Sequence, residues 1–200
     1  MSKTVKYSGD ENIQIELENG AKFSYINSFL NEKEEKELFE HLLNISEWMH
    51  GVYNMFGKPV KTPRLLWAMR EDKDIISSYN VTGSSIWTDK VEKIKSKIEK
   101  TLDTKLTYVQ LNKYRNGNDY IGAHADKEVL KGDVIASLSL GCARRFIIIN
   151  RDKTKKYEIN LKPGSLLMMN YECANKYYKH MVPKEKNIND VRINATFRNK

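Results

Sequence analysis

The sequence predicts a mainly β protein with flanking helices (α+β), in which an N-terminal portion of helices and loops flanks a C-terminal β core. Two segments of the first half repeat apolar residues every three or four positions, as amphipathic helices do. From Leu106 onward, short strand-like segments are evenly spaced and separated by Gly, Pro, Asn or Asp. With 200 residues, 40% of them hydrophobic, the chain is long enough for one domain with a single core.

The N-terminal portion starts with residues 1–24, which look like an irregular or β-rich lead-in. A helix is predicted to begin after Asn31, because an Asn side chain caps a helix N-terminus well and Glu34, three residues later, completes a capping box. The apolar face of this helix consists of Leu38, Phe39, Leu42 and Leu43.

A second helix is predicted in the segment that follows, because apolar side chains recur on one side and lysines occupy the other. The apolar residues are Trp87, Val91, Ile94, Ile98 and Leu102. The lysine-rich side could face DNA, or it could be the solvated side of a packing helix. We favour the second interpretation, since charged outer faces are routine.

Strand-like segments fill the rest of the chain. They are Thr107–Tyr114, Val134–Leu140, Arg145–Asn150, Lys156–Leu161, Ser165–Asn170, Lys179–Val182 and Arg192–Arg198. Short strands at such even spacing are typical of an all-β sandwich or jelly roll.

The composition is compatible with a polyanionic partner. Charged residues make up 30% of the chain, and the net charge is +8. A basic surface attracts nucleic acid because each neutralised phosphate releases counterions. A lysine-rich soluble protein that binds no polyanion agrees at least as well with the composition alone.

The sequence contains no signal for export or for a membrane. The N-terminus has no apolar signal-peptide core, and no stretch approaches 18 apolar residues. Cys142 and Cys173 lie outside metal-binding and redox spacings, which is usual in a reduced intracellular chain. We therefore expect an intracellular, soluble monomer without membrane contact, with nucleus and cytoplasm equally open.

One histidine-containing motif suggests a metal site. In His124-Ala125-Asp126, residues i and i+2 of an extended strand would point to the same face, so both could reach one metal ion. His180 could supply a third ligand from another strand. Two histidines and one carboxylate form the facial triad of non-haem Fe(II) oxygenases, which leaves positions open for a co-substrate and O2. An incidental tripeptide and a packed distal histidine are the structural alternatives.

The last predicted strand provides further support for such a site. Strict alternation puts Arg192, Asn194, Thr196 and Arg198 on one face and apolar residues on the other. Two arginines facing a β core need anions, because an unpaired buried guanidinium is very costly. A small dicarboxylate would satisfy both, since Arg binds carboxylate in bidentate fashion. Structural salt bridges and an exposed edge strand are the alternatives.

The first strand of the β core has a matching polar face, made of Tyr108, Gln110, Asn112 and Tyr114. The last two could add hydrogen bonds to the same dicarboxylate. In the alternative interpretation, Tyr114 is an ordinary strand aromatic.

Six segments in the second half of the chain, taken in order, resemble one family. They are Leu111–Glu128, Ile135–Gly141, Arg144–Phe146, Pro163–Asn170, His180–Lys184 and Arg192–Arg198. Together they resemble the AlkB family of Fe(II)- and 2-oxoglutarate-dependent dioxygenases, strongly over residues 106–200 and more loosely over 50–105. The resemblance implies a double-stranded β-helix, a jelly-roll (cupin-like) variant, as the catalytic core in 106–200. It implies helices and a nucleotide-recognition lid in 1–105, within a single domain overall.

The resemblance also implies a role for each candidate residue. Fe(II) would be bound by His124, Asp126 and His180. The co-substrate 2-oxoglutarate would be held by Asn112, Tyr114, Arg192, Asn194 and Arg198. Within that set, Arg192 and Tyr114 would bind the distal carboxylate, and Arg198 and Asn112 would support the end that chelates the metal.

The implied reaction is direct-reversal repair of N-alkylated DNA bases, of the 1-methyladenine and 3-methylcytosine type. O2 and 2-oxoglutarate are consumed, succinate and CO2 are formed, and the alkyl carbon is hydroxylated and lost as an aldehyde. A stacked base is out of reach inside a duplex, so it must flip into the pocket. Glu128 matches a family position near the exocyclic group of the flipped base.

A further segment resembles the hydrophobic finger of the duplex-DNA branch of the family. The wedge residues would be Met55, Phe56 and Gly57, which would fill the gap left by the flipped base. Backbone phosphates would be met by Lys58, Lys61 and Arg64. Alternatively, this is a hairpin tip whose Phe56 packs on the lid. Duplex DNA is the expected partner, with single-stranded DNA or RNA as alternatives.

The base-stacking residue departs from the family pattern. The best-matching position here is Val81, which cannot stack on a base. Trp67, Met69 or Tyr79 could substitute, and their spacing does not decide among them. RNA demethylation and a nucleic-acid-binding module without turnover are the rival functions. The complete set of metal and co-substrate residues argues against the second rival.

Overall fold

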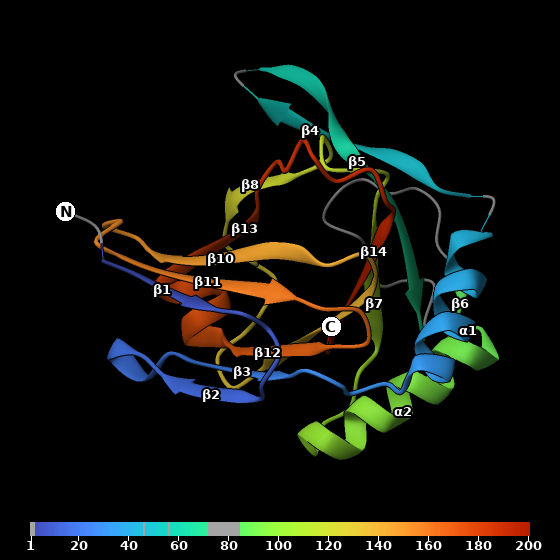
Figure 1. Cartoon of the computed structure of the whole chain (residues 1–200), viewed down its shortest axis with the longest axis horizontal. Coiled ribbons are helices and arrows are strands. Elements are labelled where there is room, and N and C mark those ends of the chain that lie inside the picture. The colour runs from blue at the N-terminus through green and yellow to red at the C-terminus, as the bar shows by residue number, and fades with distance from the viewer. Residues whose placement is uncertain (1–2, 46, 56, 72–84) are drawn as a thin grey trace.

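The computed structural model is a sandwich of two facing β-sheets, with two helices packed outside the larger sheet (Figure 1). The structure describes residues 3–45, 47–55, 57–71 and 85–200. This architecture confirms the predicted class, mainly β with flanking helices.

The smaller sheet has five strands in the described part of the chain. In spatial order they are β1 (Lys3–Tyr7), β11 (Lys155–Leu161), β10 (Arg144–Asn150), β13 (Tyr178–Val182) and β8 (Ile121–His124). Strand β1 runs parallel to β11, and the other neighbours are antiparallel. The pairing of β13 with β8 sets His180 opposite His124.

The larger sheet brings together strands from both ends of the chain. In spatial order they are β2 (Ile13–Glu16), β3 (Lys22–Ile26), β12 (Leu166–Asn170), β9 (Val134–Gly141), β14 (Arg192–Arg198), β7 (Tyr108–Tyr114), β5 (Lys58–Arg70) and β4 (Met49–Met55). A short strand, β6 (Ser85–Ile86), pairs with β5. Strand β14 pairs with β7 on one side and with β9 on the other, so it is an inner strand of the sheet.

Helices α1 (Glu32–Leu43) and α2 (Asp89–Leu102) pack on the outer face of the larger sheet. The predicted capping box is present: the N–H of Glu34 donates to Asn31 Oδ1 at 2.9 Å, and the N–H of Asn31 donates to the Glu34 carboxylate at 3.2 Å. Helix α2 buries its apolar side, as the packing interpretation expects. Two short turns, η1 (Glu18–Gly20) and η2 (Glu172–Lys176), complete the helical elements described.

Two apolar clusters hold the layers together. One joins the helices to the larger sheet and includes Leu42, Ile98, Leu111 and Ile193. The other fills the space between the sheets and includes Phe23, Ile135, Ile148 and Ile159. Each such side chain contributes about 1.5–3 kcal/mol when fully buried.

Every strand predicted from alternation is present, with ends within one residue of the prediction. The lead-in is β-rich, one of the two forms expected for residues 1–24, and its strands pair into both sheets. Two features differ from expectation. Strand β8 is an additional short strand. It ends at His124, so Asp126 lies just beyond it rather than on the same extended strand.

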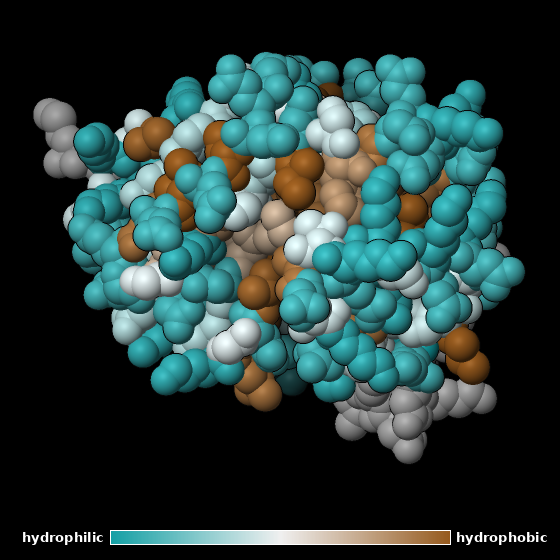
Figure 2. Space-filling view, turned by 90° about the horizontal axis from the view of Figure 1, so that it is seen from below, coloured by the Kyte–Doolittle hydropathy of each residue, from teal (hydrophilic) through white to brown (hydrophobic). Residues whose placement is uncertain are grey.

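The surface agrees with the charged composition. On the face drawn in Figure 2, hydrophilic side chains predominate and hydrophobic ones gather mainly towards the middle. No helix in the described ranges is long and apolar enough to cross a membrane.

Candidate metal and co-substrate site

A polar pocket lies between the two sheets, with about 510 Å³ of space when its open mouth is included. The larger sheet contributes side chains from β5, β7, β9, β12 and β14, and the smaller sheet contributes side chains from β8, β10 and β13. Alternation on β14 directs Arg192, Asn194, Thr196 and Arg198 into this pocket, which confirms the predicted polar face.

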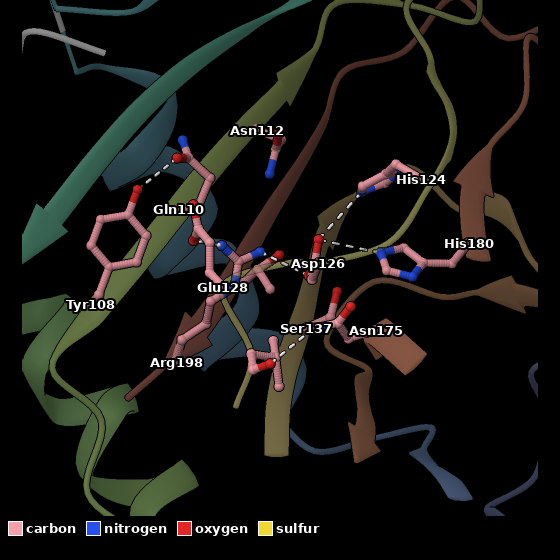
Figure 3. A network of polar contacts seen from close by, with 12 residues as sticks. Tyr108, Gln110, Asn112, His124, Asp126, Glu128, Ser137, Asn175, His180 and Arg198 are labelled. Carbon is pink, nitrogen blue, oxygen red and sulfur yellow. Dashed lines mark hydrogen bonds and ion pairs between the residues drawn. The ribbon is translucent and has the colours of Figure 1, made fainter. Parts of the chain in front are cut away.

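Three candidate metal ligands converge at the pocket (Figure 3). Their ligand atoms all lie within 4.8 Å of one another. Asp126 Oδ1 is 3.4 Å from His124 Nε2 and 3.6 Å from His180 Nε2. Asp126 reaches this position although it lies outside β8, because its N–H donates to the carbonyl oxygen of Ala174 at 3.0 Å.

Neighbouring groups orient two of these ligands. His124 Nδ1 lies 2.9 Å from the carbonyl oxygen of Gly122, an arrangement in which Nδ1–H donates and Nε2 is free to face a metal ion. Arg198 Nη2 donates to Asp126 Oδ2 at 2.9 Å, which leaves Oδ1 directed at the imidazoles. Oδ1 is therefore the oxygen of the carboxylate that is available for a metal ion.

Electrostatics favours the metal-binding protonation states. Burial alone would raise the pKa of Asp126, but the charge of Arg198 and the interactions with His180 and His124 outweigh it and hold that pKa well below its usual range. Burial, with a contribution from His124, lowers the pKa of His180. An ionised carboxylate and a neutral imidazole are the forms that bind metal.

Arg192 provides the clearest sign of an anion site. Its side chain is 1% exposed, and Nη2 donates to Ser139 Oγ at 2.9 Å. Its Nε and Nη1 are buried and have no hydrogen-bond partner among the described residues. Burial is the main cause that lowers the pKa of Arg192. A buried guanidinium with open N–H groups is costly by itself and suits a carboxylate ligand.

Two hydrogen-bonded amides, those of Asn112 and Asn194, also line the pocket. Asn112 Nδ2 lies 3.4 Å from Asn194 Oδ1, in agreement with their pairing across β7 and β14. Asn194 Nδ2 donates to Ser137 Oγ at 2.7 Å. Ser137 and Ser139 were not predicted as site residues. Alternation along β9 was a usable signal for them, because both lie on its pocket-facing side.

Glu128 lies beside the metal ligands. Its Oε2 accepts from Arg198 Nη1 at 3.0 Å and lies 2.8 Å from Lys200 Nζ. Its Oε1 is buried and has no hydrogen-bond partner in the part of the chain that the structure describes. The carboxylate therefore presents one open acceptor near the triad.

Arg64 corrects one expectation. Instead of meeting phosphates at the surface, its side chain is buried, lines the pocket and donates from Nε to Asn112 Oδ1 at 2.7 Å. The physical reason is a register shift: His50 pairs with Leu65 but Val52 pairs with Lys61, so extra residues on β5 re-aim Arg64.

Trp67 is a second correction. It pairs with Leu111 on β7 and belongs to the apolar cluster beneath the helices, on the opposite face from Gln110 and Asn112. Met69 belongs to the same cluster. Strand alternation thus turns both side chains away from the pocket, so neither is placed to stack on a base there.

The remaining substrate candidates lie at the β4–β5 hairpin or cannot be placed. Met55 ends β4, while Gly57 and Lys58 are exposed at the turn and the start of β5. Gly57 adopts φ 77°, which favours glycine. Phe56, Tyr79 and Val81 lie outside the described residues.

The family was settled by comparison with known proteins. The model of the 2OG-Fe(II) oxygenase superfamily matches residues 22–198. The chain belongs to this superfamily. Both the metal triad and the arginine of the anion site fall within the matched range.

Relatives place this oxygenase in the AlkB family. DNA oxidative demethylase ALKBH2 of Homo sapiens is 30% identical, over 82% of this chain and 68% of its own length. The Bos taurus protein of the same name is 29% identical over 82% of this chain, which spans only 64% of it. Alpha-ketoglutarate-dependent dioxygenase alkB homolog 3 of Homo sapiens is 28% identical, over 85% of this chain and 63% of its own length.

Solved structures confirm the jelly-roll fold of the oxygenase. OsALKBH1 superimposes with a TM-score of 0.65 at 15% identity, covering 88% of this chain and 97% of that one. A prolyl hydroxylase from Trichoplax adhaerens gives a TM-score of 0.61 at 13% identity, covering 88% and 83%.

The cofactors of the superfamily are Fe(II) and 2-oxoglutarate, and the residues present fit both. Two imidazoles and one carboxylate oxygen are the donor set of a facial Fe(II) site. The open N–H groups of Arg192 match a carboxylate of the co-substrate. The oxygenase is thus an Fe(II)/2-oxoglutarate-dependent dioxygenase.

Proposed function

We propose that this oxygenase removes alkyl groups from N-alkylated bases in DNA and so repairs alkylation damage directly. Relatives named DNA oxidative demethylase, 27–30% identical, support the proposal. The observation that carries it is the unpartnered Oε1 of Glu128, whose other oxygen pairs with Arg198, the same arginine that pairs with the metal ligand Asp126.

The proposed division of labour among the side chains is as follows. His124, Asp126 and His180 hold Fe(II). Arg192 and Tyr114 bind the distal carboxylate of 2-oxoglutarate, and the metal-proximal end is supported by Asn112, Asn194 and Arg198. When bound, Fe(II) and 2-oxoglutarate supply an oxidation by O2 that is coupled to formation of succinate and CO2. The protein positions the reactants and excludes water.

Glu128 selects the base in this proposal. An ionised carboxylate can only accept hydrogen bonds, so its open Oε1 suits an amino group. In 1-methyladenine and 3-methylcytosine, an exocyclic amino group is adjacent to the methylated nitrogen. One hydrogen bond to Glu128 would therefore hold the amino group and direct the methyl group towards the metal. Bases with a carbonyl at that position offer no donor.

The β4–β5 hairpin is the proposed contact with duplex DNA. It projects from the sandwich at the top of the view in Figure 1. Exposed Lys58 and Lys61 on β5 would meet phosphates, and the tip residues Met55, Phe56 and Gly57 would act as the wedge. Residues 1–105 thus contain the proposed nucleotide-recognition lid. A monomer suffices, because one chain supplies the whole pocket.

The test is release of formaldehyde and succinate with matched oligonucleotides. The substrates are 3-methylcytosine in duplex DNA, single-stranded DNA and RNA, with unmethylated DNA as the control. We expect turnover on methylated DNA, fastest on the duplex. Faster turnover on RNA would make RNA the substrate. Binding of nucleic acid without any turnover would identify a module that has lost its chemistry.

A further inference from the structure

Arg144, the first residue of β10, is fully buried and yet does not line the pocket. Its Nε donates to Glu185 Oε2 at 3.0 Å. Its Nη1 donates to the carbonyl oxygen of Asn116 at 3.2 Å. Its Nη2 donates to the carbonyl oxygens of Asp119 at 3.0 Å and Pro183 at 2.7 Å. One guanidinium thus holds four acceptors.

These acceptors lie on two connections that border the site. Asn116 and Asp119 belong to the connection between β7, which carries Tyr114, and β8, which carries His124. Pro183 and Glu185 belong to the connection between β13 and β14, which carry His180 and Arg192 respectively. A single side chain therefore links the two connections that join the strands carrying Tyr114, His124, His180 and Arg192.

The two connections also contact each other through backbone. Gly117 N–H donates to Ile188 O at 2.8 Å, and Glu185 N–H donates to Gly117 O at 2.8 Å. A Cβ atom at Gly117 would lie 1.7 Å from Glu185 O, so this close approach requires glycine. The guanidinium of Arg144 stabilises this junction because it satisfies carbonyl groups from both sides.

Arg144 also contacts the co-substrate pocket indirectly, through an aromatic ring. Its Cζ lies 5.5 Å from the ring centroid of Tyr114, and Arg192 Cζ lies 5.2 Å from the same centroid. Both distances are within the range of cation–π attraction. The ring of Tyr114 is therefore held by one arginine that lines the pocket and another that lies behind it.

We propose that Arg144 is a positioning residue for 2-oxoglutarate. It sets the ring of Tyr114 relative to Arg192, and it fixes the spacing between the co-substrate strands and the metal-bearing strands. The proposal rests on the assignment of Arg192 and Tyr114 to the distal carboxylate. It predicts that losing the Arg144 guanidinium weakens co-substrate binding while the metal ligands remain intact.

The experiment is calorimetric titration of 2-oxoglutarate into Mn(II)-loaded protein without O2, so that no turnover is needed. Arg144→Lys should raise the dissociation constant of 2-oxoglutarate about tenfold, as loss of a supporting residue commonly does. The dissociation constant of Mn(II) should change less than twofold. Arg145→Lys is the matched control, because Arg145 donates to Glu185 Oε1 at 3.0 Å but contacts neither Tyr114 nor the loop carbonyls in any interaction of the described residues.

Arg192→Leu distinguishes a failure of the co-substrate assignment from a failure of the inference about Arg144. If it leaves 2-oxoglutarate binding unchanged, the co-substrate assignment itself fails. If it abolishes binding while Arg144→Lys lowers only the melting temperature, Arg144 is merely structural and the inference is overturned. Should Arg144→Lys not fold, Glu185→Gln decides when it is compared with Arg145→Lys. It removes the carboxylate charge that Arg144 and Arg145 share, and it leaves the Arg144 guanidinium in place. A dissociation constant raised beyond that of the Arg145→Lys control supports the inference, and one equal to that of the control overturns it.

Discussion

At the scale of single residues, the site depends on how each polar atom is assigned a partner. Asp126 divides its two oxygen atoms between Arg198 and the imidazoles, and Glu128 divides its own between a pair of cations and an open position. Asp126 was predictable from the HxD motif and Arg198 from strand alternation, whereas Glu128 was identified only through the family resemblance. Their pairing was not, because hydrogen-bond partners more than 50 residues apart depend on the register of the assembled sheets.

Arg192 carries the co-substrate assignment. Arg192→Leu should raise the apparent KM for 2-oxoglutarate by about 10- to 100-fold, since a hydrogen bond to a charged group contributes about 1.5–3 kcal/mol. Succinate formation at varied 2-oxoglutarate measures it, with Arg145→Leu as the control for a partly exposed guanidinium. An unchanged KM together with lost DNA binding would show that Arg192 contacts nucleic acid instead.

In the proposed function, Glu128 determines the preference for bases with an exocyclic amino group. Glu128→Gln keeps the shape of the side chain but can place an amide N–H₂ donor where Oε1 now accepts. Turnover of 3-methylcytosine should fall about tenfold relative to 3-methylthymine, whose carbonyl faces that position, because a mismatched polar pair costs about 1–3 kcal/mol. The measurement is the ratio of single-turnover rates, with exposed Glu47→Gln as control. An unchanged ratio would remove Glu128 from base recognition.

At the scale of elements, alternation explains both the successes and the failures of the sequence analysis. Strands β7 and β14 alternate strictly, so their polar faces were predictable. Strand β5 contains Pro59 and Pro63, which weaken any strand prediction, and its register shift breaks the pattern that would have placed Arg64. Strand β8 is four residues long and includes Gly122, too little for a periodic signal.

A substitution of Trp67 tests whether strand alternation on β5 turns this side chain away from the pocket. Because its side chain is 6% exposed and packs beneath the helices, Trp67→Ala should lower the free energy of unfolding by about 3–5 kcal/mol. Urea denaturation measures this loss. The single-turnover rate on methylated DNA should be unaffected in the folded protein. If Trp67→Ala has normal stability but a lower affinity for the methylated substrate, Trp67 stacks on the base after all.

Phe56 tests the proposed finger, although it lies outside the described residues. A wedge offsets part of the unstacking cost of a duplex, of order a few kcal/mol, and a single strand has no such cost. Phe56→Ala should therefore slow repair of a duplex lesion much more than repair of the same lesion in a single strand. Lys58→Ala, which removes a proposed phosphate contact, should weaken both. Equal loss on both substrates, with a lowered melting temperature, would indicate that Phe56 packs within the protein.

At the scale of the whole molecule, the pocket exists only where the two sheets face each other. The larger sheet supplies the co-substrate residues, and the smaller sheet supplies both histidines. The mainly β class and the polar faces follow from the sequence pattern. The order of strands within each sheet does not, because β14 pairs with β7 and β9 across long stretches of chain that local periodicity cannot relate.

The most direct measurement is the stoichiometry of one reaction. Wild-type protein with Fe(II), O2, 2-oxoglutarate and a duplex containing 3-methylcytosine should release formaldehyde and succinate in a one-to-one ratio. His124→Ala should release neither, since loss of one of three protein ligands removes metal affinity or geometry. Full activity of His124→Ala, or succinate without formaldehyde from the wild-type protein on every methylated nucleic acid tested, would contradict the proposed site and its chemistry.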